Sequence, residues 1–146
     1  MEKVEIVKVK LVKEKDLFVD NIHIKEPKDC YKVISDFLDN PDREHFIVLG
    51  LSTNNKISVI STISIGTLNS SLVHPREVFK TAILSNCNKI IISHNHPSGN
   101  CTPSQEDKNI TSRLINSGNL LGINILDHII ISDESYFSFK ENELFF

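Results

Sequence analysis

Residues 89–93, KIIIS, form a short unbroken apolar run that is bounded by polar residues. Such a run is typical of a strand that is buried on both faces and has neighbouring strands at both edges. The sheet that contains it must therefore be covered on both sides. The run predicts a central strand, and it favours fold classes in which other elements cover both faces of the sheet.

Patterns of both helical and strand type surround this run. Apolar residues at helical spacing predict helices over residues 27–38, 74–86 and 104–117, with Gly118 as the cap that ends the third. Strand patterns cover residues 4–12, 17–24, 44–52, 56–66, 123–132 and 136–140, with TNNK as the turn between the middle two. The alternation predicts an α/β fold with a mixed β-sheet flanked by helices.

The length of 146 residues suits one compact domain. We expect a single domain over residues 1–146, in which residues 1–23 are an N-terminal strand segment and residues 24–146 are the main body. Lys8 and Lys10 share one face of the expected first strand. We expect these two lysines to be solvated or to protect a sheet edge, with a phosphate contact as the alternative.

Composition narrows the function classes. No apolar run approaches the roughly 18–20 residues of a membrane-spanning helix, and the N-terminus lacks the apolar block of a signal peptide. We therefore expect a cytoplasmic protein with no membrane partner. The net charge of −3 gives no general attraction to nucleic acid. The three cysteines, Cys30, Cys87 and Cys101, form no CxxC pair and favour no disulfide framework.

Residues 93–107, SHNHPSGNCTPSQED, place two histidines directly after the central strand. Residues two apart in an extended chain project to the same side, so His94 and His96 can face one point. Imidazole is a common nitrogen ligand for zinc. The following PSGNCTP reverses the chain and starts a helix, for which we expect Thr102 as N-cap, Pro103 at the first position and Gln105 as capping-box partner.

Asp107 lies three residues after Ser104 on that helix and aligns with the apolar stripe of Ile110 and Leu114. A carboxylate on a buried stripe needs a cation or strong hydrogen-bond donors. Two histidines and one aspartate give three protein ligands with an open fourth position, which is the pattern of catalytic zinc. The remaining histidines, His23, His45, His74 and His128, are expected to be packed or surface residues.

His94-x-His96, seven residues and then Ser104-x-x-Asp107 are similar to the JAMM (MPN-type) metalloprotease signature. HNHPSG, with GTLNSSLVHPREVFK before it and LLGINILDHIII after it, resembles the RadC-like branch of bacterial JAB-domain proteins, which carry a DNA-repair label. The similarity runs from about residue 24 to the C-terminus. It implies a cytidine-deaminase-like JAMM (MPN) architecture and a peptidase or isopeptidase activity.

The resemblance also implies roles for individual residues. His94, His96 and Asp107 would hold one Zn²⁺ per chain with water as fourth ligand, and Ser104 would steady the oxyanion of a tetrahedral intermediate. Glu44 in REHFIVLG matches the family's acid/base glutamate, and a surface carboxylate is the alternative for it. The expected substrate is a peptide or isopeptide bond.

Two other functions stay open from the sequence. One is a DNA-repair accessory or metal-dependent nucleic-acid enzyme, and the other is a non-catalytic zinc-containing module that binds a partner. The letters HNH at 94–96 are not an HNH nuclease motif, because the residues of that motif are spread over a hairpin and a helix. Oligomeric state is open as well.

The sequence departs from the family in two places. RadC-like chains commonly carry a preceding helix-hairpin-helix region, and we expect these 146 residues to lack it, which weakens a DNA role. Asn100-Cys101 is an unusual pair in the turn. We expect Cys101 to be a loop residue, with a soft metal ligand as the alternative.

Overall fold

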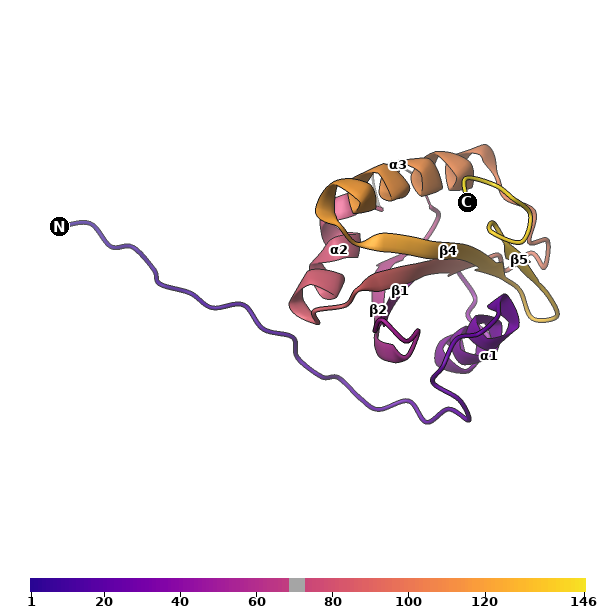
Figure 1. Ribbon diagram of the computed structural model, residues 1–146, viewed down its shortest axis with the longest axis horizontal. Helices are drawn as coiled ribbons and strands as arrows, with labels where there is room; N and C mark the ends of the chain where they lie inside the picture. Colours follow the sequence, from indigo (N-terminus) through magenta and orange to yellow (C-terminus); the bar gives the residue numbers. More distant parts are fainter. Residues whose placement is uncertain (69–72) are drawn as a thin grey trace.

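The computed structural model describes residues 1–68 and 73–146 (Figure 1). Its helices are α1 (Pro27–Leu38), α2 (Pro75–Leu84) and α3 (Gln105–Leu121). Its strands are β1 (His45–Leu51), β2 (Ile57–Ile65), β3 (Lys89–Asn95), β4 (Asn124–Ile131) and β5 (Tyr136–Ser138). Residues 69–72, part of the GTLNSSLVHPREVFK motif, lie outside the described residues.

The strands form one mixed sheet in the order β2-β1-β3-β4-β5, with β3 in the middle. β1 is antiparallel to both β2 and β3, whereas β3 and β4 are parallel. A parallel pair needs a crossover connection, and α3 supplies it between β3 and β4. The predicted α/β class and the central position of the KIIIS run are confirmed.

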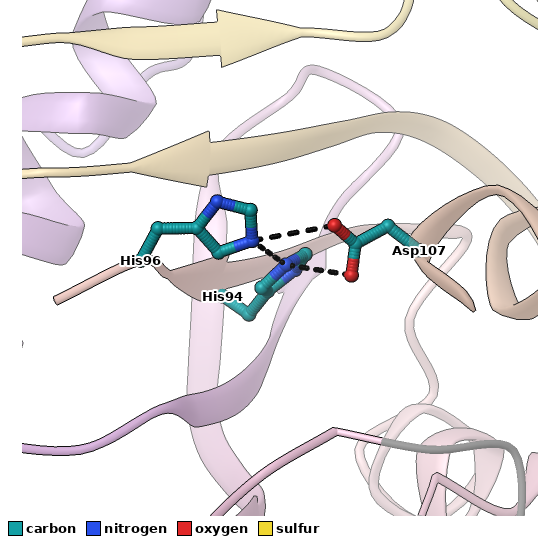
Figure 2. Close-up of side chains that lie close together, drawn as sticks. All are labelled: His94, His96 and Asp107. Carbon is teal, nitrogen blue, oxygen red and sulfur yellow. Dashed lines mark hydrogen bonds and ion pairs between the residues drawn. The ribbon is translucent and has the colours of Figure 1, made fainter. Parts of the chain in front are cut away.

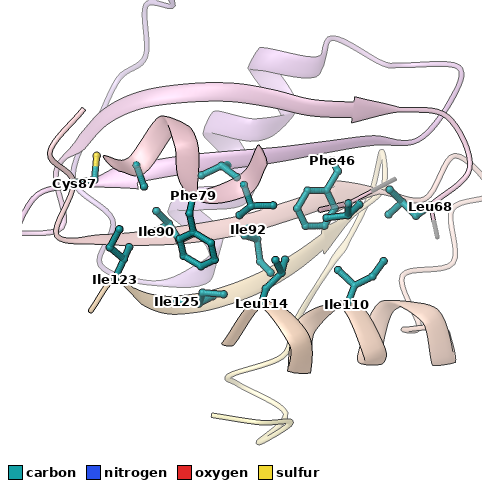
Figure 3. Packing of buried hydrophobic residues seen from close by; sticks show 14 residues of the cluster. Phe46, Leu68, Phe79, Cys87, Ile90, Ile92, Ile110, Leu114, Ile123 and Ile125 are labelled. Carbon is teal, nitrogen blue, oxygen red and sulfur yellow. The ribbon is translucent and has the colours of Figure 1, made fainter. Parts of the chain in front are cut away.

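Helices cover both faces of the sheet, with α1 on one side and α2 and α3 on the other (Figure 1). Alternate residues of β3 serve the two layers because successive strand side chains point to opposite faces. Ile92 packs with Phe79 of α2 and Leu114 of α3 (Figure 3). Ile91 packs with Ile34 of α1 in the other layer. The apolar run is thus buried on both faces, as its composition predicts.

The N-terminal segment differs from the prediction. The structure forms no strand over residues 4–12, and Ile6 and Val9 are 100% and 70% exposed. In place of a strand over residues 17–24, an isolated bridge joins His23 to Lys56. An alternating sequence makes a strand only where another strand supplies ladder hydrogen bonds, and within residues 1–68 and 73–146 nothing pairs with this segment beyond that bridge.

The end of α3 also differs from the prediction. The helix continues past Gly118 to Leu121, and Gly122 at φ 73° is the left-handed C-cap. Gly118 is buried within the helix, where a side chain would collide with the carbonyl oxygen of Ile123 and lie 3.2 Å from the Phe79 ring. The glycine therefore permits close packing and does not end the helix.

All three cysteines are free and buried. Cys30 packs in the α1 layer and Cys87 in the α2–α3 layer. Within the described part of the chain, no helix combines the length and the apolar character that a membrane span requires.

We expect Gly118→Ala to destabilise the protein, although alanine is the better helix former by about 1 kcal/mol. The added methyl group meets backbone that cannot move without displacing the start of β4, and overpacking of this kind costs about 1–3 kcal/mol. Thermal or urea unfolding measures the difference. Asn119→Ala, at the exposed neighbouring position of α3, is the matched control and should be neutral or stabilising. A Gly118→Ala protein as stable as the parent would contradict the close packing.

Candidate metal centre

The two motif histidines lie where β3 ends. His94 is in the last part of the strand and is fully buried, and His96 follows it with a side chain that is 13% exposed. The backbone N–H of His96 donates to the carbonyl oxygen of Ile131 at 2.8 Å, which continues the β3–β4 ladder by one step. Both imidazoles consequently project to the same side of the sheet, as their spacing predicts.

The turn after His96 leads the chain back to the site. Gly99 has φ 89°, a conformation that side chains disfavour, and its N–H donates to the carbonyl oxygen of His96 at 3.0 Å. The Nδ1 atom of His96 lies 2.7 Å from the carbonyl oxygen of Asn100. A carbonyl only accepts, so Nδ1 carries the hydrogen and Nε2 is free to bind a metal ion.

Asp107 is oriented by the beginning of α3. Ser104 is the N-cap: its Oγ accepts from the N–H of Asp107 at 3.1 Å, and its own N–H donates to Oδ2 of Asp107 at 2.8 Å. The prediction of Thr102 as N-cap with Gln105 was wrong by two residues. Thr102 with Gln105 and Ser104 with Asp107 are both three residues apart, as a capping box requires. The structure forms the box with Ser104 and Asp107, while the N–H of Thr102 donates to the Asn100 side chain.

The three predicted ligands converge on one point (Figure 2). The two Nε2 atoms of His94 and His96 are 3.0 Å apart, and they lie 3.1 and 3.3 Å from Oδ1 and Oδ2 of Asp107, respectively. Ligand atoms about 2.0–2.1 Å from a tetrahedral ion are separated by about 3.3–3.4 Å. The measured distances are close to this separation, with those to Asp107 running to its two different oxygens, so His94, His96 and Asp107 could hold a metal ion.

The electrostatics of the group suit a cation. Burial alone raises the pKa of Asp107, but hydrogen bonds from His94 and His96 outweigh it and hold the pKa far below its usual range. Burial lowers the pKa of His96, and this is outweighed by its bonds to Asp107 and Asn100 and by the charges of Asp107 and Glu44, so that the pKa is raised. The carboxylate is thus ionised and in need of positive charge.

Comparison with known proteins agrees with this geometry, since residues 24–144 match the RadC-like JAB domain. The chain belongs to this RadC-like family. A UPF0758 protein of Desulfitobacterium hafniense is 54% identical over 118 residues, which make up 81% of this chain and 52% of that protein. A UPF0758 protein of Clostridioides difficile is 56% identical over 119 residues, 82% of this chain and 51% of that protein.

This RadC-like JAB domain spans about half the length of the curated relatives it matches. The names of these relatives state no activity. The predicted family resemblance is confirmed, and the sheet and helices agree with a JAB/MPN domain. JAB/MPN domains include metalloproteases, and the His-His-Asp group of this chain is of the type found in their JAMM sites.

Glu44 lies immediately before β1 and is directed to the site by strand register. Phe46 pairs with His94 at the end of the antiparallel β1–β3 ladder, so Glu44, two residues before Phe46, lies at the same end of the sheet as His96. Its Oε2 accepts from the N–H of Leu68 at 3.0 Å. Its charge contributes to the raised pKa of His96, so the carboxylate is within electrostatic range of the ligands.

Sequence reasoning missed Asn95, which holds the backbone on both sides of Glu44. Its Oδ1 accepts from the N–H of His45 at 2.7 Å, and its Nδ2 donates to the carbonyl oxygen of Arg43 at 2.9 Å. Asn95 is 4% exposed and stands between the two ligand histidines. Its position between the two histidines of HNH could have indicated a buried amide, and a buried amide must find hydrogen-bond partners.

His128 was expected to be a packed residue and is indeed fully buried, but it also contacts a ligand. Its Nε2 lies 2.9 Å from Nδ1 of His94. Burial lowers its pKa well below the usual value, and the charge of His94 lowers it further. The available signal was a histidine within the apolar run ILDHIII, since a buried ring nitrogen must find a partner.

Cys101 and Ser104 lie in the irregular stretch that leads into α3. Ser104 is exposed, and its Oγ–H is not used in the capping bond, in which Oγ accepts. Cys101 is a loop residue, as expected, and its Sγ lies 3.4 Å from Oγ of Ser135. It packs with Ile130 and Phe139 and is not part of the His-His-Asp group.

Metal binding should weaken on acidification. The pKa of His96 is raised above 6.5, so below that pKa its ring carries a proton that a metal ion must displace. Affinity rises as the pH increases through the raised pKa and falls below it, by about tenfold per pH unit for each proton displaced. Zinc titration with a competing chelator between about pH 5.5 and 7.5 measures this.

Asp107→Asn is the matched variant for this titration. It keeps the shape of the side chain but removes both a charged ligand and the charge that raises the pKa of His96. We expect a loss of zinc affinity of at least about tenfold at every pH tested, with the pH midpoint shifted downward. A zinc affinity of the parent protein that stays constant over this pH range would show that His96 is not a ligand.

Proposed function

We propose that this domain is a zinc-dependent hydrolase that cleaves an amide bond of a peptide or isopeptide. The observation that carries the proposal is a His-His-Asp group that could hold a metal ion, with the Glu44 carboxylate close enough for its charge to raise the pKa of His96. A purely structural zinc site usually has four protein ligands, and it does not require a further carboxylate such as that of Glu44 beside the ion. Membership of the RadC-like JAB family supports the same class of chemistry.

Zinc is the metal that we propose. Two imidazoles and one carboxylate are a donor set that zinc accepts, and three protein ligands leave one position open for substrate chemistry. Zinc bound there would supply a Lewis acid and a water activated to lose its proton near pH 7. His94, His96 and Asp107 would hold the ion, and other side chains would supply the rest of the chemistry.

Glu44 is proposed as the acid/base group. Its Oε2 accepts the hydrogen bond from Leu68, which leaves Oε1 to take a proton from the attacking water. The same carboxyl group then gives that proton to the nitrogen of the leaving amine. The bond from Leu68 fixes the direction of the carboxylate, and Asn95 fixes the backbone that carries it.

Ser104 is proposed to stabilise charge on the substrate. Its Oγ is fixed by the N–H of Asp107, and its hydroxyl hydrogen is available to the oxygen that becomes negative when a carbonyl is attacked. Because Ser104 is the residue that caps α3, its position is tied to that of Asp107 by two hydrogen bonds.

A cavity of about 370 Å³ adjoins the candidate site and could receive a substrate side chain. It lies between the end of α1 and the ends of β3 and β4, and His96 is part of its wall. Polar side chains such as Ser35, Asn95 and Ser132 line it together with Leu38 and Ile131.

We expect Glu44→Gln to bind zinc like the parent protein and to lose at least about 100-fold in kcat, because the amide cannot accept the proton. A fluorogenic peptide and isopeptide panel measures the activity, and metal analysis measures zinc. Glu134→Gln, at an exposed position of the β4–β5 turn, is the control and should be unchanged. Full activity of Glu44→Gln would remove Glu44 from the mechanism. Zinc binding by the parent without hydrolysis of any substrate would favour the partner-binding alternative.

Asn95→Ala should reduce kcat by about tenfold or more with little change in zinc affinity. The variant frees the backbone around Glu44, whereas the ligand histidines keep their ladder position. Kinetics at a temperature far below the unfolding transition separate this effect from instability. Asn54→Ala, in the exposed β1–β2 turn, is the control. A loss of zinc in parallel with activity would show that Asn95 supports the ligands and not Glu44.

A further inference from the structure

His94 and His96 are oriented by different kinds of partner. The Nδ1 atom of His96 faces a carbonyl oxygen, which can only accept a hydrogen bond. The Nδ1 atom of His94 faces Nε2 of His128 at 2.9 Å, and an imidazole nitrogen can either donate or accept. The contact between the two rings therefore does not by itself determine which nitrogen of His94 carries the hydrogen.

Thr111 removes this ambiguity. Its Oγ1 donates its single hydrogen to the carbonyl oxygen of Asp107 at 2.6 Å. The same Oγ1 lies 2.5 Å from Nδ1 of His128, and because its hydrogen is already used it must accept there. The hydrogen of that contact accordingly belongs to Nδ1 of His128.

The surroundings of His128 favour an uncharged ring with one hydrogen only. The residue is fully buried, its ring stacks on Phe139 with centroids 4.6 Å apart, and the ring of Phe46 meets it in a T-shaped arrangement with centroids 5.9 Å apart. With its hydrogen on Nδ1, the Nε2 atom of His128 accepts from His94. His94 then carries its hydrogen on Nδ1 and presents the lone pair of Nε2 to the metal position.

We propose that Thr111 and His128 are positioning residues that select the metal-binding tautomer of His94. The hydrogen bonds run in one direction, from His94 to His128, then to Thr111, and then to the backbone of Asp107. The chain of bonds begins at one ligand and ends at another, so it also sets the distance between the end of β3 and the first turn of α3. Outer partners of this type typically change metal affinity by about 10–100-fold when removed.

This inference rests on the metal binding of the proposed function and does not require its catalytic part. A direct test compares two substitutions of Thr111, which is fully buried. Thr111→Val keeps the volume and removes the hydroxyl, whereas Thr111→Ser keeps the hydroxyl and removes a methyl group. Zinc affinity is measured by competition with a chromogenic chelator, and thermal unfolding of the metal-free proteins is measured alongside.

We expect Thr111→Val to lose about 10–100-fold in zinc affinity and Thr111→Ser to stay within about threefold of the parent. A purely packing role predicts the opposite order, because the serine variant has the cavity. Equal affinities of the valine and serine variants, or a weaker serine variant, would overturn the proposal.

Substitutions of His128 test the other half of the relay. His128→Phe fills the space between Phe46 and Phe139 but offers no acceptor to His94, and we expect a loss of affinity similar to that of Thr111→Val. His128→Gln carries an amide oxygen that can accept from His94, and it should recover part of the loss. A glutamine variant as weak as the phenylalanine variant would count against the acceptor role.

The direction of the relay has its own measurement. Nitrogen NMR of the zinc-loaded parent protein should show the hydrogen of His128 on Nδ1 and none on Nε2. A hydrogen on Nε2 would overturn the relay while leaving zinc binding intact. If the parent protein binds no zinc at all, the proposed function fails, and this inference fails with it. Zinc binding together with a hydrogen on Nε2 of His128 overturns only the relay, so the two results distinguish the two failures.

Discussion

The carboxylate of Asp107 is the group on which the geometry of the site depends. Its Oδ2 accepts from the N–H of Ser104 at 2.8 Å and lies 3.3 Å from His96, and its Oδ1 lies 3.1 Å from His94. A carboxylate that is 3% exposed is costly unless donors or a cation surround it. The N–H of Ser104 supplies a donor from the start of α3, and the histidines at the end of β3 contact the same carboxylate directly or would share a cation with it, which ties the two elements together.

The central strand explains how segments far apart in the sequence reach one point. β3 has an antiparallel neighbour on one side and a parallel neighbour on the other. The antiparallel neighbour β1 places Glu44 at the end of the sheet where His96 lies, and the parallel neighbour β4 brings His128 to His94. An edge strand would have only one of these neighbours. The buried character of KIIIS and the supply of groups around the histidines therefore have a common cause.

The parts of the site that sequence could predict depend on local spacing. His94 and His96 are two apart on a strand and Asp107 is three from Ser104 on a helix, and both spacings translate directly into shared faces. Asn95 meets its partner because β3 lies beside β1, and His128 meets His94 because β3 lies beside β4. The register between two strands cannot be derived from the sequence of either strand alone. The prediction of a strand over residues 4–12 was wrong for the same reason. Alternation shows which side chains share a face, but it does not show which strand would pair with the segment. The N-cap of α3 was predicted wrongly because two overlapping patterns, Thr102 with Gln105 and Ser104 with Asp107, both fit a capping box.

Each ligand is held on the side away from the metal position by a group of the protein itself. Asn100 bonds His96, His128 bonds His94, and the N–H of Ser104 bonds Asp107. The ordering of three side chains is thus part of folding, and binding an ion does not have to impose it. Glu44 is held separately, by Leu68 and through Asn95, so the groups that fix the ligands and the groups that fix the carboxylate are different. A substitution that loosens one set of supports can therefore leave the other set in place.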